Sequence, residues 1–550
     1  MTQPRITIFT KPNCPYCERA KRILQSYSYT ERDVTHPRNA DATLYFSGVG
    51  TVPQIFIGDY HINGADDLER LYATGKLSYL IDTVQNATLT IDSASDKALK
   101  EGAEDQTLRT IINRQDSSRS NDPEIWPLLQ FSKDFFGFWP NTYDYLNQWP
   151  EIFKMFVYCH YIPAIDCGKQ NLGMSDMLAV GYATSEAHGC SYCQVHSVAA
   201  NGEKSLGVGE QLRQAKEGNS DDDNPYDDLS VAVTDLAAKA TLNQITRDFL
   251  DRTVEKLQAL STASTTAYDY VEAVEMMVAN LGFLNVFNDL IGTEIEGDWA
   301  KQAEEQSGIE AGRHAVQEKN PSNLDYVLPT GGPSMLEMMT KYDKAIEDLA
   351  GYANRNFGLM PDWISLWPTA LQKKQAFFYG EVMCNGDRTP ISAELKHLMA
   401  RVSAIAKNHG YLSAVEGFMA YHTSSVKPIA IDKVRHCFAV ATGKKSPKGL
   451  FTDREDAALK FAWLSAQVPL KTPSKFIQPA ISLYTGKELA YLSIVCALAS
   501  LLQRFSAIAK PELEPEVFQF MEKHQLVSNT LRLRYPEPCK RFSELEKAIA

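Results

Sequence analysis

The first 82 residues contain short apolar segments whose periodicity switches between that of a strand and that of a helix. Residues 5–10 (RITIFT) predict a buried strand, and the segment after Cys17 has apolar positions at helical spacing. The later elements are a strand at 29–33, a polar helix around 40–46, a strand at 52–57, a hairpin return through GDYHING and a helix within 66–81. This order predicts one small α/β domain.

The pattern changes after this domain. Residues 83–122 are polar and contain few aromatic side chains, so they predict a linker with one helix at most. From residue 123 onward the chain is rich in aromatic residues and in apolar positions at helical spacing. The remainder is therefore predicted to be all-helical.

A repeat with a constant offset of 221 residues runs through this helical part. Residues 136–140 (FGFWP) match 357–361 (FGLMP), and His188-Gly189 matches His409-Gly410. Near the ends of both halves, VEMMVANLGFLNVFNDL lies opposite LSIVCALASLLQRFSAI. A duplication predicts two all-α domains, at 123–325 and 326–550, and chance similarity between amphipathic helices is the alternative.

Composition narrows the class of protein. With 55 Lys and Arg against 68 Asp and Glu, the net charge of −13 argues against binding to nucleic acid or to an anionic membrane. No apolar stretch is long enough for a membrane span, and 489–502 predicts a buried core helix. The N-terminus has no apolar leader, so we expect a cytoplasmic protein, in which structural disulfides are rare.

The first candidate site is a CxxC motif placed between a predicted strand and a predicted helix. There the helix N-terminus and Lys11 favour the thiolate of Cys14, and Cys17 lies one turn further as the resolving thiol. Zinc knuckles share the CxxC motif, but this domain has no second CxxC or CxxH to complete a tetrahedral site.

Residues 4–82 resemble the dithiol glutaredoxins. The similar segments are Cys14-Pro15-Tyr16-Cys17, Thr51-Val52-Pro53 and Gly64-Ala65-Asp66-Asp67. The resemblance implies a thioredoxin-like α/β fold, a cis proline after Val52 and glutathione as the reductant. It also implies that the glutathione-binding residues are Lys11, Tyr16, Thr51, Val52, Pro53, Asp66 and Asp67. A helix N-terminus suits the carboxylate of such a ligand.

The second candidate site is Cys190-x2-Cys193-x2-His196. On a helix Cys193 and His196 share a face, so the imidazole can take the thiol proton, and Glu186 is placed to orient a histidine. The second repeat lacks both cysteines and His196, so it predicts a structural partner only. A zinc site using Cys190, Cys193, His196 and His188, or an inert buried thiol pair, are the alternatives.

This region resembles the alkylhydroperoxidase D (AhpD) / carboxymuconolactone decarboxylase-like family, over about 130–300 and, as a degenerate copy, about 340–520. In its peroxidase members the second cysteine attacks the peroxide and the first resolves it, which implies those roles for Cys193 and Cys190. Two departures exist: the histidine follows after two residues instead of three, and the family's upstream glutamate is Leu178 here. Glu186 and Asp176 are the nearest carboxylates, and the resemblance implies a homo-oligomer.

Together these motifs predict an oxidoreductase: a fused thiol-dependent hydroperoxide reductase. Cys193 and Cys190 reduce the peroxide, and the glutathione-dependent dithiol Cys14/Cys17 re-reduces them. No metal cofactor is predicted. The alternatives are a glutathione-dependent protein disulfide oxidoreductase whose helical part binds a client protein, and a scaffold that senses redox state.

Overall fold

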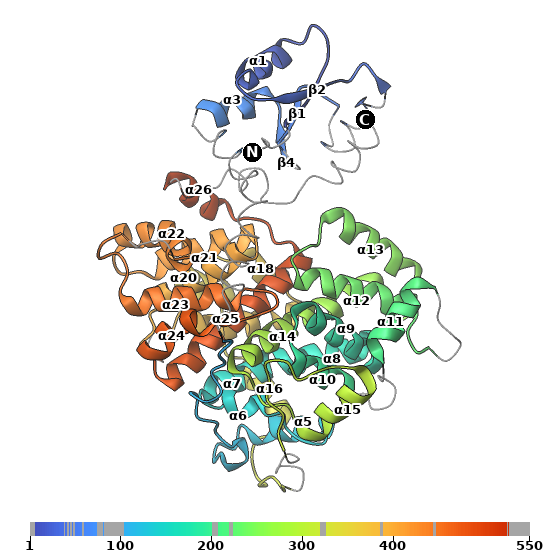
Figure 1. The fold of residues 1–550 in the computed structure, drawn as a ribbon, viewed down its shortest axis with the longest axis vertical. Helices are drawn as coiled ribbons and strands as arrows, with labels where there is room; N and C mark the ends of the chain where they lie inside the picture. The colour runs from blue at the N-terminus through green and yellow to red at the C-terminus, as the bar shows by residue number, and fades with distance from the viewer. Residues whose placement is uncertain are drawn as a thin grey trace. The chain divides into compact units, whose positions relative to one another are not determined.

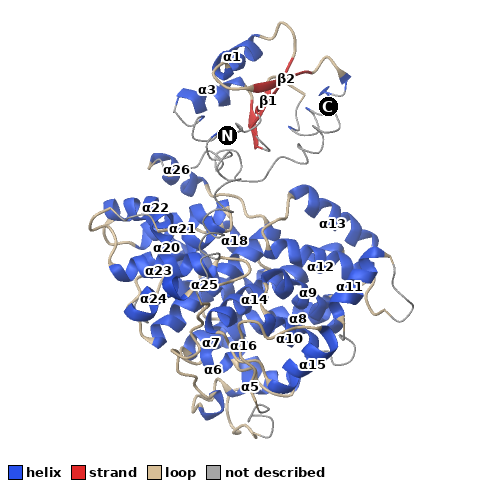
Figure 2. Cartoon of the chain, in the orientation of Figure 1, coloured by secondary structure: helices blue, strands red, loops and turns tan. Residues whose placement is uncertain are grey.

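The computed structural model describes residues 6–37, 39–40, 43, 47, 50–57, 60–73, 77, 81, 104–200, 207–218, 224–318, 326–385, 389–443, 447–524 and 526. The chain divides into two compact units (Figures 1 and 2). One unit contains residues 1–101 and the chain's four-stranded sheet, and the other contains most of residues 102–516 and is helical among its described residues.

The N-terminal unit is built on a sheet with strand order β2-β1-β3-β4. Central strand β1 (Ile6–Thr10) pairs in parallel with β2 (Tyr29–Asp33) and antiparallel with β3 (Gln54–Ile57), which pairs with β4 (Tyr60–Asn63). Helix α1 (Pro15–Leu24) joins β1 to β2, because parallel neighbours need a crossover.

Apolar side chains from both central strands form the core of this unit together with the two helices. Ile8 and Ile55 are fully buried there, as are Leu24 of α1 and Leu68 of α3 (Ala65–Ala73). The predicted strands and helices among the described residues are thus confirmed in order, and α3 covers the first part of the helix predicted within 66–81. The predicted helix around 40–46 lies largely outside the described residues.

The second unit contains helices of very different lengths, from four residues to 25 residues. Before the repeat boundary they are α5 (Trp126–Phe136), α6 (Thr142–Leu146), α7 (Pro150–Phe156), the π-helical turn η2 (Val157–Tyr161), α8 (Ile162–Asn171), α9 (Gly173–His188), α10 (Ser191–Ala199), α11 (Val208–Glu217), α12 (Asp228–Thr241), α13 (Arg247–Ala259), α14 (Ala267–Ile291) and α15 (Gly297–Ser307). A short 3₁₀ turn, η1 (Ser117–Arg119), precedes them.

The second half repeats this plan. Its helices are α16 (Met335–Asp343), α17 (Leu349–Phe357), α18 (Asp362–Ser365), α19 (Thr369–Met383), α20 (Ala393–Ala406), α21 (Gly410–Thr423), α22 (Lys427–Ala441), α23 (Asp453–Ser465), α24 (Ser474–Leu483) and α25 (Gly486–Ala509). Helix α26 (Pro515–Lys523) follows in the sequence, and from Val517 onward it groups with the N-terminal unit. Both FG motifs end a helix: Gly137 after α5 and Gly358 after α17 have φ of 85° and 80°, a left-handed conformation that favours glycine.

Apart from the start of α13, the described helices of both repeats, up to α25, lie within one compact unit. Helices α14 and α25 lie side by side at its centre (Figure 1). A Cβ on Gly282 of α14 would lie 3.0 Å from the backbone oxygen of Ser500 on α25, so the glycine permits this close approach.

Two expectations from the sequence need correction. Residues 104–122 are not a linker: Leu108 and Ile112 are buried, and the Gln106 backbone N–H donates to Thr472 O. Helix α25 is also longer than the 489–502 stretch suggested. It and α14 are long and apolar enough to cross a membrane, but 94% and 89% of their most apolar windows are buried in the unit, as is typical of core helices.

Candidate functional site

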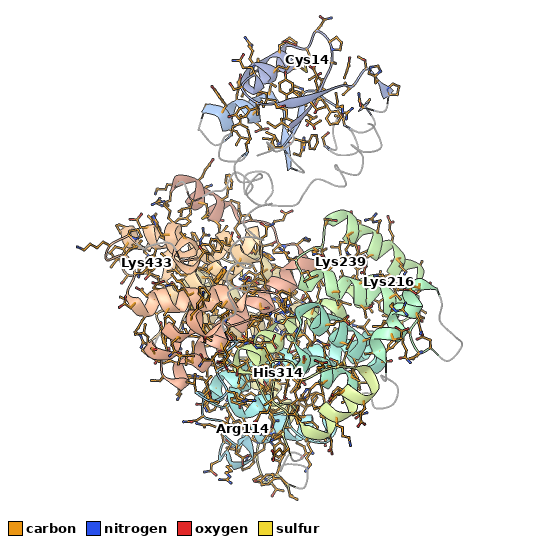
Figure 3. All side chains as sticks on the ribbon, in the orientation of Figure 1. Cys14, Arg114, Lys216, Lys239, His314 and Lys433 are labelled. Carbon is orange, nitrogen blue, oxygen red and sulfur yellow. A yellow bond between two sulfur atoms is a disulfide. The ribbon has the colours of Figure 1, made fainter. Side chains whose placement is uncertain are left out.

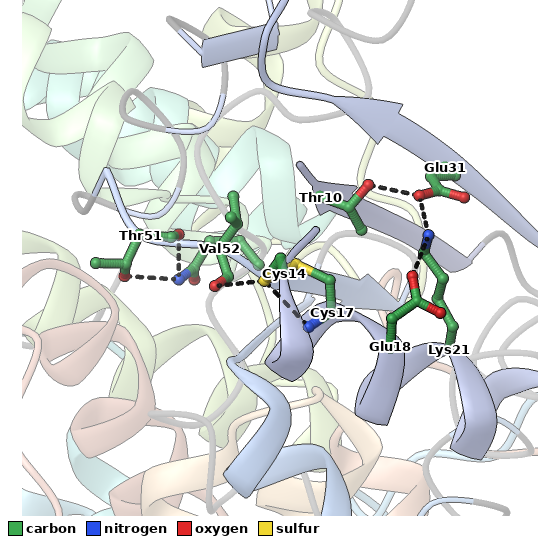
Figure 4. Close-up of a disulfide and its surroundings, with 9 residues drawn as sticks. Thr10, Cys14, Cys17, Glu18, Lys21, Glu31, Thr51 and Val52 are labelled. Atoms are coloured by element: carbon green, nitrogen blue, oxygen red, sulfur yellow. Dashed lines mark hydrogen bonds and ion pairs between the residues drawn. A yellow bond between two sulfur atoms is a disulfide. The ribbon is translucent and has the colours of Figure 1, made fainter. Parts of the chain in front are cut away.

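The first dithiol lies at the start of α1. Cys14 is the N-cap residue, forms a disulfide with Cys17 and accepts a hydrogen bond from the Cys17 backbone N–H at 3.2 Å (Figure 4). Pro15 takes the first helical position, where a missing N–H is tolerated. A dithiol at a helix N-terminus is placed for thiol–disulfide exchange, because the helix dipole favours a thiolate there.

The segment predicted to bind glutathione adjoins this disulfide. Val52–Pro53 is a cis peptide, and the Val52 carbonyl oxygen lies 3.8 Å from Cys14 Sγ. Tyr16 is exposed, and Asp66 and Asp67 occupy the first turn of α3. Lys11 and Thr51 are exposed as well. The Asp66 carboxylate pairs with Arg19 of α1 at 2.9 Å, which fixes the start of α3 beside the dithiol helix.

The second dithiol lies at the start of α10, in the helical unit. Cys190 is the N-cap residue and Cys193 stands in the first turn, and both are free thiols. Cys190 is 0% exposed and Cys193 is 4% exposed. The side-chain amide of Asn288 on α14 donates to Cys193 Sγ at 3.7 Å. Burial raises the pKa of the Cys190 thiol well above its ordinary value, and Cys193 and Asp289 act in the same direction.

Cys193 lines an apolar cavity of about 70 Å³ that Cys190 does not reach. The walls are largely aromatic and aliphatic, formed by Phe135, Phe136, Pro140, Tyr143, Tyr161, Ile165, Met177, Leu178, Met277, Leu281 and Leu284. His196 and Asn280 are among its polar lining residues, and the buried Asn280 Oδ1 has no hydrogen-bond partner among the described residues. The cavity therefore presents a thiol and a free acceptor within apolar walls.

His196 is held by a carboxylate that the sequence did not indicate. Its Nδ1 donates to the Tyr192 carbonyl at 2.8 Å, and its Nε2 lies 3.1 Å from Glu296 Oε2. The predicted carboxylate, Glu186, is exposed and accepts a hydrogen bond from Tyr182 at 2.8 Å. The expectation that Glu186 orients a histidine is wrong for His196, because α9 turns Glu186 outward.

A network of ionisable side chains lies beside Cys190. Asp289 on α14 lies between two histidines, 3.0 Å from Nε2 of His314 and 3.4 Å from Nε2 of His188 (Figure 3 labels His314). His188 Nδ1 accepts from Nη2 of Arg504, which comes from α25 of the second repeat, at 3.0 Å. The second repeat therefore contributes a charged side chain beside the dithiol site of the first repeat.

The pKa values of the side chains in this network follow from burial and from the ion pairs. Burial opposes ionisation of Asp289, yet hydrogen bonds from His188 and His314 lower its pKa well below the ordinary range. Burial also disfavours a charged imidazole, but Asp289 and Cys190 raise the pKa of His314 to about 9. Burial lowers the pKa of His188 to about 4. At neutral pH His314 is therefore the charged histidine and His188 the neutral one.

Three side chains of this network could also hold a metal ion. Ligand atoms of Cys190, Asp289 and His314 all lie within 4.8 Å of one another, and the three residues are buried. This donor set suits Zn²⁺ better than Mg²⁺ or Ca²⁺ because it offers sulfur and nitrogen. It shares only Cys190 with the set predicted as the zinc alternative, since Asp289 and His314 stand in place of Cys193, His196 and His188.

The sequence held a signal for two of the four residues that were missed, Asp289 and Arg504. Asp289 and Arg504 are single charges within otherwise apolar segments, and a charge in such a position is retained only when it is paired or functional. Glu296 and His314 follow α14 in turns and stand in no comparable apolar segment. Packing alone brings them to the dithiol.

The family model and the sequence relatives described here match the N-terminal unit. A family model, Glutaredoxin, matches residues 6–62. Glutaredoxin 3 of Escherichia coli (strain K12) is 43% identical over 79 residues, which are 14% of this chain and 95% of that protein. The solution structure of glutaredoxin from Brucella melitensis is 40% identical, covering 15% of this chain and 94% of that chain with a TM-score of 0.14.

Another relative carries a glutaredoxin-like segment inside a longer protein. Hybrid peroxiredoxin hyPrx5 of Haemophilus influenzae is 45% identical over 73 residues, which are 13% of this chain and 30% of that protein. The chain thus matches less than a third of the length of this relative.

The four-stranded sheet and the dithiol at the start of α1 define a thioredoxin-like thiol–disulfide oxidoreductase. Through this domain the chain belongs to the glutaredoxin family. Thiol redox chemistry with glutathione as reductant and protein disulfides as substrates follows for this domain.

Proposed function

We propose that the chain is a cytoplasmic, glutathione-dependent peroxidase: the AhpD-like helical unit reduces an organic hydroperoxide, and the glutaredoxin domain supplies the electrons. The observation that carries the proposal is the placement of two thiols at the start of α10. Cys193 opens on the apolar cavity, and Cys190 lies fully buried one turn before it. Such a pair separates an attacking thiol from a resolving thiol.

In the first step the Cys193 thiolate attacks the terminal oxygen of the hydroperoxide. The S–O bond forms, the O–O bond breaks, and the alcohol leaves after its oxygen takes a proton. In this proposal His196, which lines the same cavity, supplies that proton from its Nε2 when the Nε2–H moves from Glu296 to the leaving oxygen. In the second step Cys190 attacks the sulfenic acid, the disulfide forms and water leaves. The sulfur is oxidised by two electrons and the peroxide is reduced by two.

The disulfide is then reduced by thiol exchange. A thiolate attacks Cys193, because the cavity lies on its side, and Cys190 leaves as the thiol. When Cys14 is the attacking thiol, Cys17 resolves the mixed disulfide, and two glutathione molecules reduce the resulting Cys14–Cys17 disulfide. Covalent connection of both dithiols raises their effective concentration. Because Cys193 is 4% exposed, this step requires local opening around the cavity.

The lining of the cavity favours an organic substrate over hydrogen peroxide. Aromatic walls gain free energy by burying an alkyl or aryl group, and hydrogen peroxide has none. The free Asn280 Oδ1 can accept the hydroperoxide O–H. A relative named a hybrid peroxiredoxin also carries a glutaredoxin-like segment, which supports the pairing of these two activities in one chain.

Two observations support alternative functions. The near-complete burial of both thiols fits a disulfide oxidoreductase whose helical part binds a client protein or senses redox state. The proximity of Cys190, Asp289 and His314 fits a bound zinc ion. Zinc would occupy the thiol of Cys190 and prevent it from resolving a sulfenic acid on Cys193, so the metal site and peroxidase turnover exclude each other in the same molecule.

One experiment separates them. The full chain is reduced, freed of reductant and mixed with one equivalent of cumene hydroperoxide, and its peptides are examined by mass spectrometry. The proposal predicts a Cys190–Cys193 disulfide in step with peroxide loss, unchanged in a C167S control. Unconsumed peroxide with both thiols intact rejects the proposal, and one zinc per chain in the same preparation identifies the metal site.

A further inference from the structure

The second repeat contains a thiol–imidazole pair of its own. Cys384 ends α19, and its Sγ lies 3.5 Å from Nε2 of His397 on α20. On the other side of the imidazole, Nδ1 of His397 lies 2.8 Å from Oε2 of Glu416 on α21. Three consecutive helices therefore bring a cysteine, a histidine and a carboxylate into one line of contacts.

The carboxylate determines which nitrogen of His397 can act as a base. An ionised carboxylate only accepts hydrogen bonds, so Nδ1 carries the hydrogen, and in the neutral imidazole Nε2 keeps its lone pair towards Cys384. Glu416 is itself held by the Tyr379 hydroxyl, which donates to Oε1 at 2.5 Å. His397 is 0% exposed, so water does not compete for these contacts. The imidazole is therefore oriented as a general base for the thiol.

Cys384 needs such a base because its surroundings keep it protonated. It stands at the C-terminal end of a helix, where the helix dipole disfavours a thiolate. Burial raises the pKa of the Cys384 thiol to about 12, and this rise is opposed by Lys396 and supported by Glu416 and Glu381. At neutral pH the sulfur becomes a nucleophile only when a neighbouring group takes its proton.

The sulfur of Cys384 is more accessible than the histidine behind it. Cys384 is half-buried, and its other close neighbour is the backbone oxygen of Asn356 at 3.3 Å. Among the described residues, no hydrogen bond or disulfide joins Cys384 to another cysteine. Oxidation here therefore has no adjacent resolving thiol, and a mixed disulfide with a small thiol is its reversible product.

We propose that Cys384 is a modification site: its thiol, with His397 as the base and Glu416 as a positioning residue, exchanges with glutathione disulfide. Cys384 Sγ attacks one sulfur of that disulfide, a new S–S bond forms, and the old S–S bond breaks. His397 Nε2 takes the thiol proton and passes it to the leaving glutathione thiolate. The Cys384 sulfur is oxidised, and one glutathione is released in its reduced form.

The oxidant comes from the chemistry of the same chain. When glutathione reduces the dithiol of the glutaredoxin domain, glutathione disulfide is the product. A half-buried sulfur favours such a small disulfide over a disulfide within a folded protein. The inference goes beyond the proposed function, because it assigns a reactive thiol to the repeat that lacks the CxxC motif and needs no peroxide.

The test follows the mixed disulfide in the full chain. A C14S/C17S background removes the glutaredoxin dithiol, which would itself transfer glutathione. Reduced protein is incubated with glutathione disulfide at pH 7, and the modification of each cysteine is quantified over time by mass spectrometry. Cys167 is the matched control: it is also half-buried, and burial raises its pKa to about 12, but its described partners are Glu272 and Asn171 instead of a histidine.

We expect Cys384 to be modified at least about tenfold faster than Cys167, and H397Q to remove most of that advantage, because general bases contribute this much or more. E416Q should slow the modification of Cys384 by about threefold or more, since the imidazolium loses its compensating charge. A residue that only packs against the thiol would, when replaced, expose Cys384 and speed its modification. Equal rates for Cys384 and Cys167, or an unchanged or faster rate in H397Q, overturn the proposal.

If H397Q and E416Q do not fold, by circular dichroism, the rates of Cys384 and Cys167 in the C14S/C17S protein decide. The expected advantage of Cys384 supports the proposal, and its absence overturns it. Failure of peroxide reduction together with rapid modification of Cys384 would reject the proposed function and leave this inference in place.

Discussion

The two helical repeats share a hydrogen-bonding arrangement at a helix start and differ in the reactive side chains around it. In the first repeat Glu296 accepts from the Asn141 backbone N–H at 2.7 Å and from the Tyr192 hydroxyl at 3.3 Å. In the second, Glu514 accepts from the Asp362 backbone N–H at 2.6 Å and from the Tyr411 hydroxyl at 2.7 Å. We call each of these glutamates, Glu296 and Glu514, a clamp. Each joins a later loop to the N-terminal end of a short helix, α6 or α18.

The two clamp residues, Glu296 and Glu514, have different neighbours. Glu296 also lies against His196 on the cavity of Cys193. With Tyr411 as the counterpart of Tyr192, the places of Cys193 and His196 fall to Leu412 and Val415 in the second repeat. The second repeat buries another polar group, Glu416, and satisfies it with His397 and Tyr379 at 2.8 and 2.5 Å. Both repeats therefore use a buried glutamate to join a loop to a helix, and only in the first repeat does that glutamate also lie against a residue lining the cavity of Cys193.

Replacing the resolving thiol tests the separation of roles within the first repeat. In C190S we expect turnover with glutathione and cumene hydroperoxide to fall at least about 100-fold, because no disulfide can form for the reductant to attack. The first equivalent of peroxide is still consumed, and the sulfenic acid on Cys193 is trapped by dimedone and found by mass spectrometry. Trapping at a different cysteine would contradict the assignment, and C167S serves as the control.

Removing the two clamp carboxylates sets one repeat directly against the other. E296A and E514A should each lower the free energy of unfolding by about 2–3 kcal/mol, because a buried N–H and a tyrosine hydroxyl lose their acceptor. Only E296A should also lower kcat/KM for the hydroperoxide, by about tenfold, since His196 loses its carboxylate. Urea denaturation and initial rates measure both effects. Equal activity in the two variants would mean that the clamp is structural in both repeats.

Lys407, a buried lysine of the second repeat, should make the free energy of unfolding depend on pH. Burial and Arg504 lower its folded pKa to about 7 from an ordinary value of 10.5. The unfolded state therefore binds this proton more readily, and the penalty is complete below pH 7 and disappears as the pH rises towards 10.5. K407M should raise the free energy of unfolding by about 2 kcal/mol at pH 6, and by less at pH 9. A gain that is equal at both pH values would show that the buried charge of Lys407 is not the source of the penalty.

The smallest effect is expected at Glu186. It is exposed and bonded to Tyr182, so E186Q should leave kcat/KM within about twofold of wild type. A loss of kcat/KM as large as that expected for E296A would show that Glu186 takes part in proton transfer.

Local patterns in the sequence predicted the N-terminal domain almost completely. Strand 29–33 is found at those residues, and the CxxC is at the predicted helix start, because both depend on nearby residues only. The repeat also shows in helix ends such as Gly137 and Gly358. The constant offset nevertheless misassigns one role: it puts Tyr411 opposite Cys190, while the structure uses Tyr411 as the counterpart of Tyr192.

The second dithiol's surroundings could not be predicted in the same way. Glu296, His314 and Arg504 lie about 100 to 300 residues from Cys193 along the chain, and only the packing of α14 and α25 brings them together. The linker prediction failed for a similar reason. Residues 104–122 are polar on average, but Leu108 and Ile112 are fixed by contacts with the helical unit that a local pattern does not contain.

The central claim is that electrons pass from glutathione through Cys14 to Cys193. Its most direct test is the oxidation of NADPH by the full chain with glutathione, glutathione reductase and cumene hydroperoxide, in wild type, C14S and C193S. The account predicts that both variants lose peroxide-dependent oxidation, while C193S still reduces a small mixed disulfide. Full peroxide turnover in C193S would contradict it.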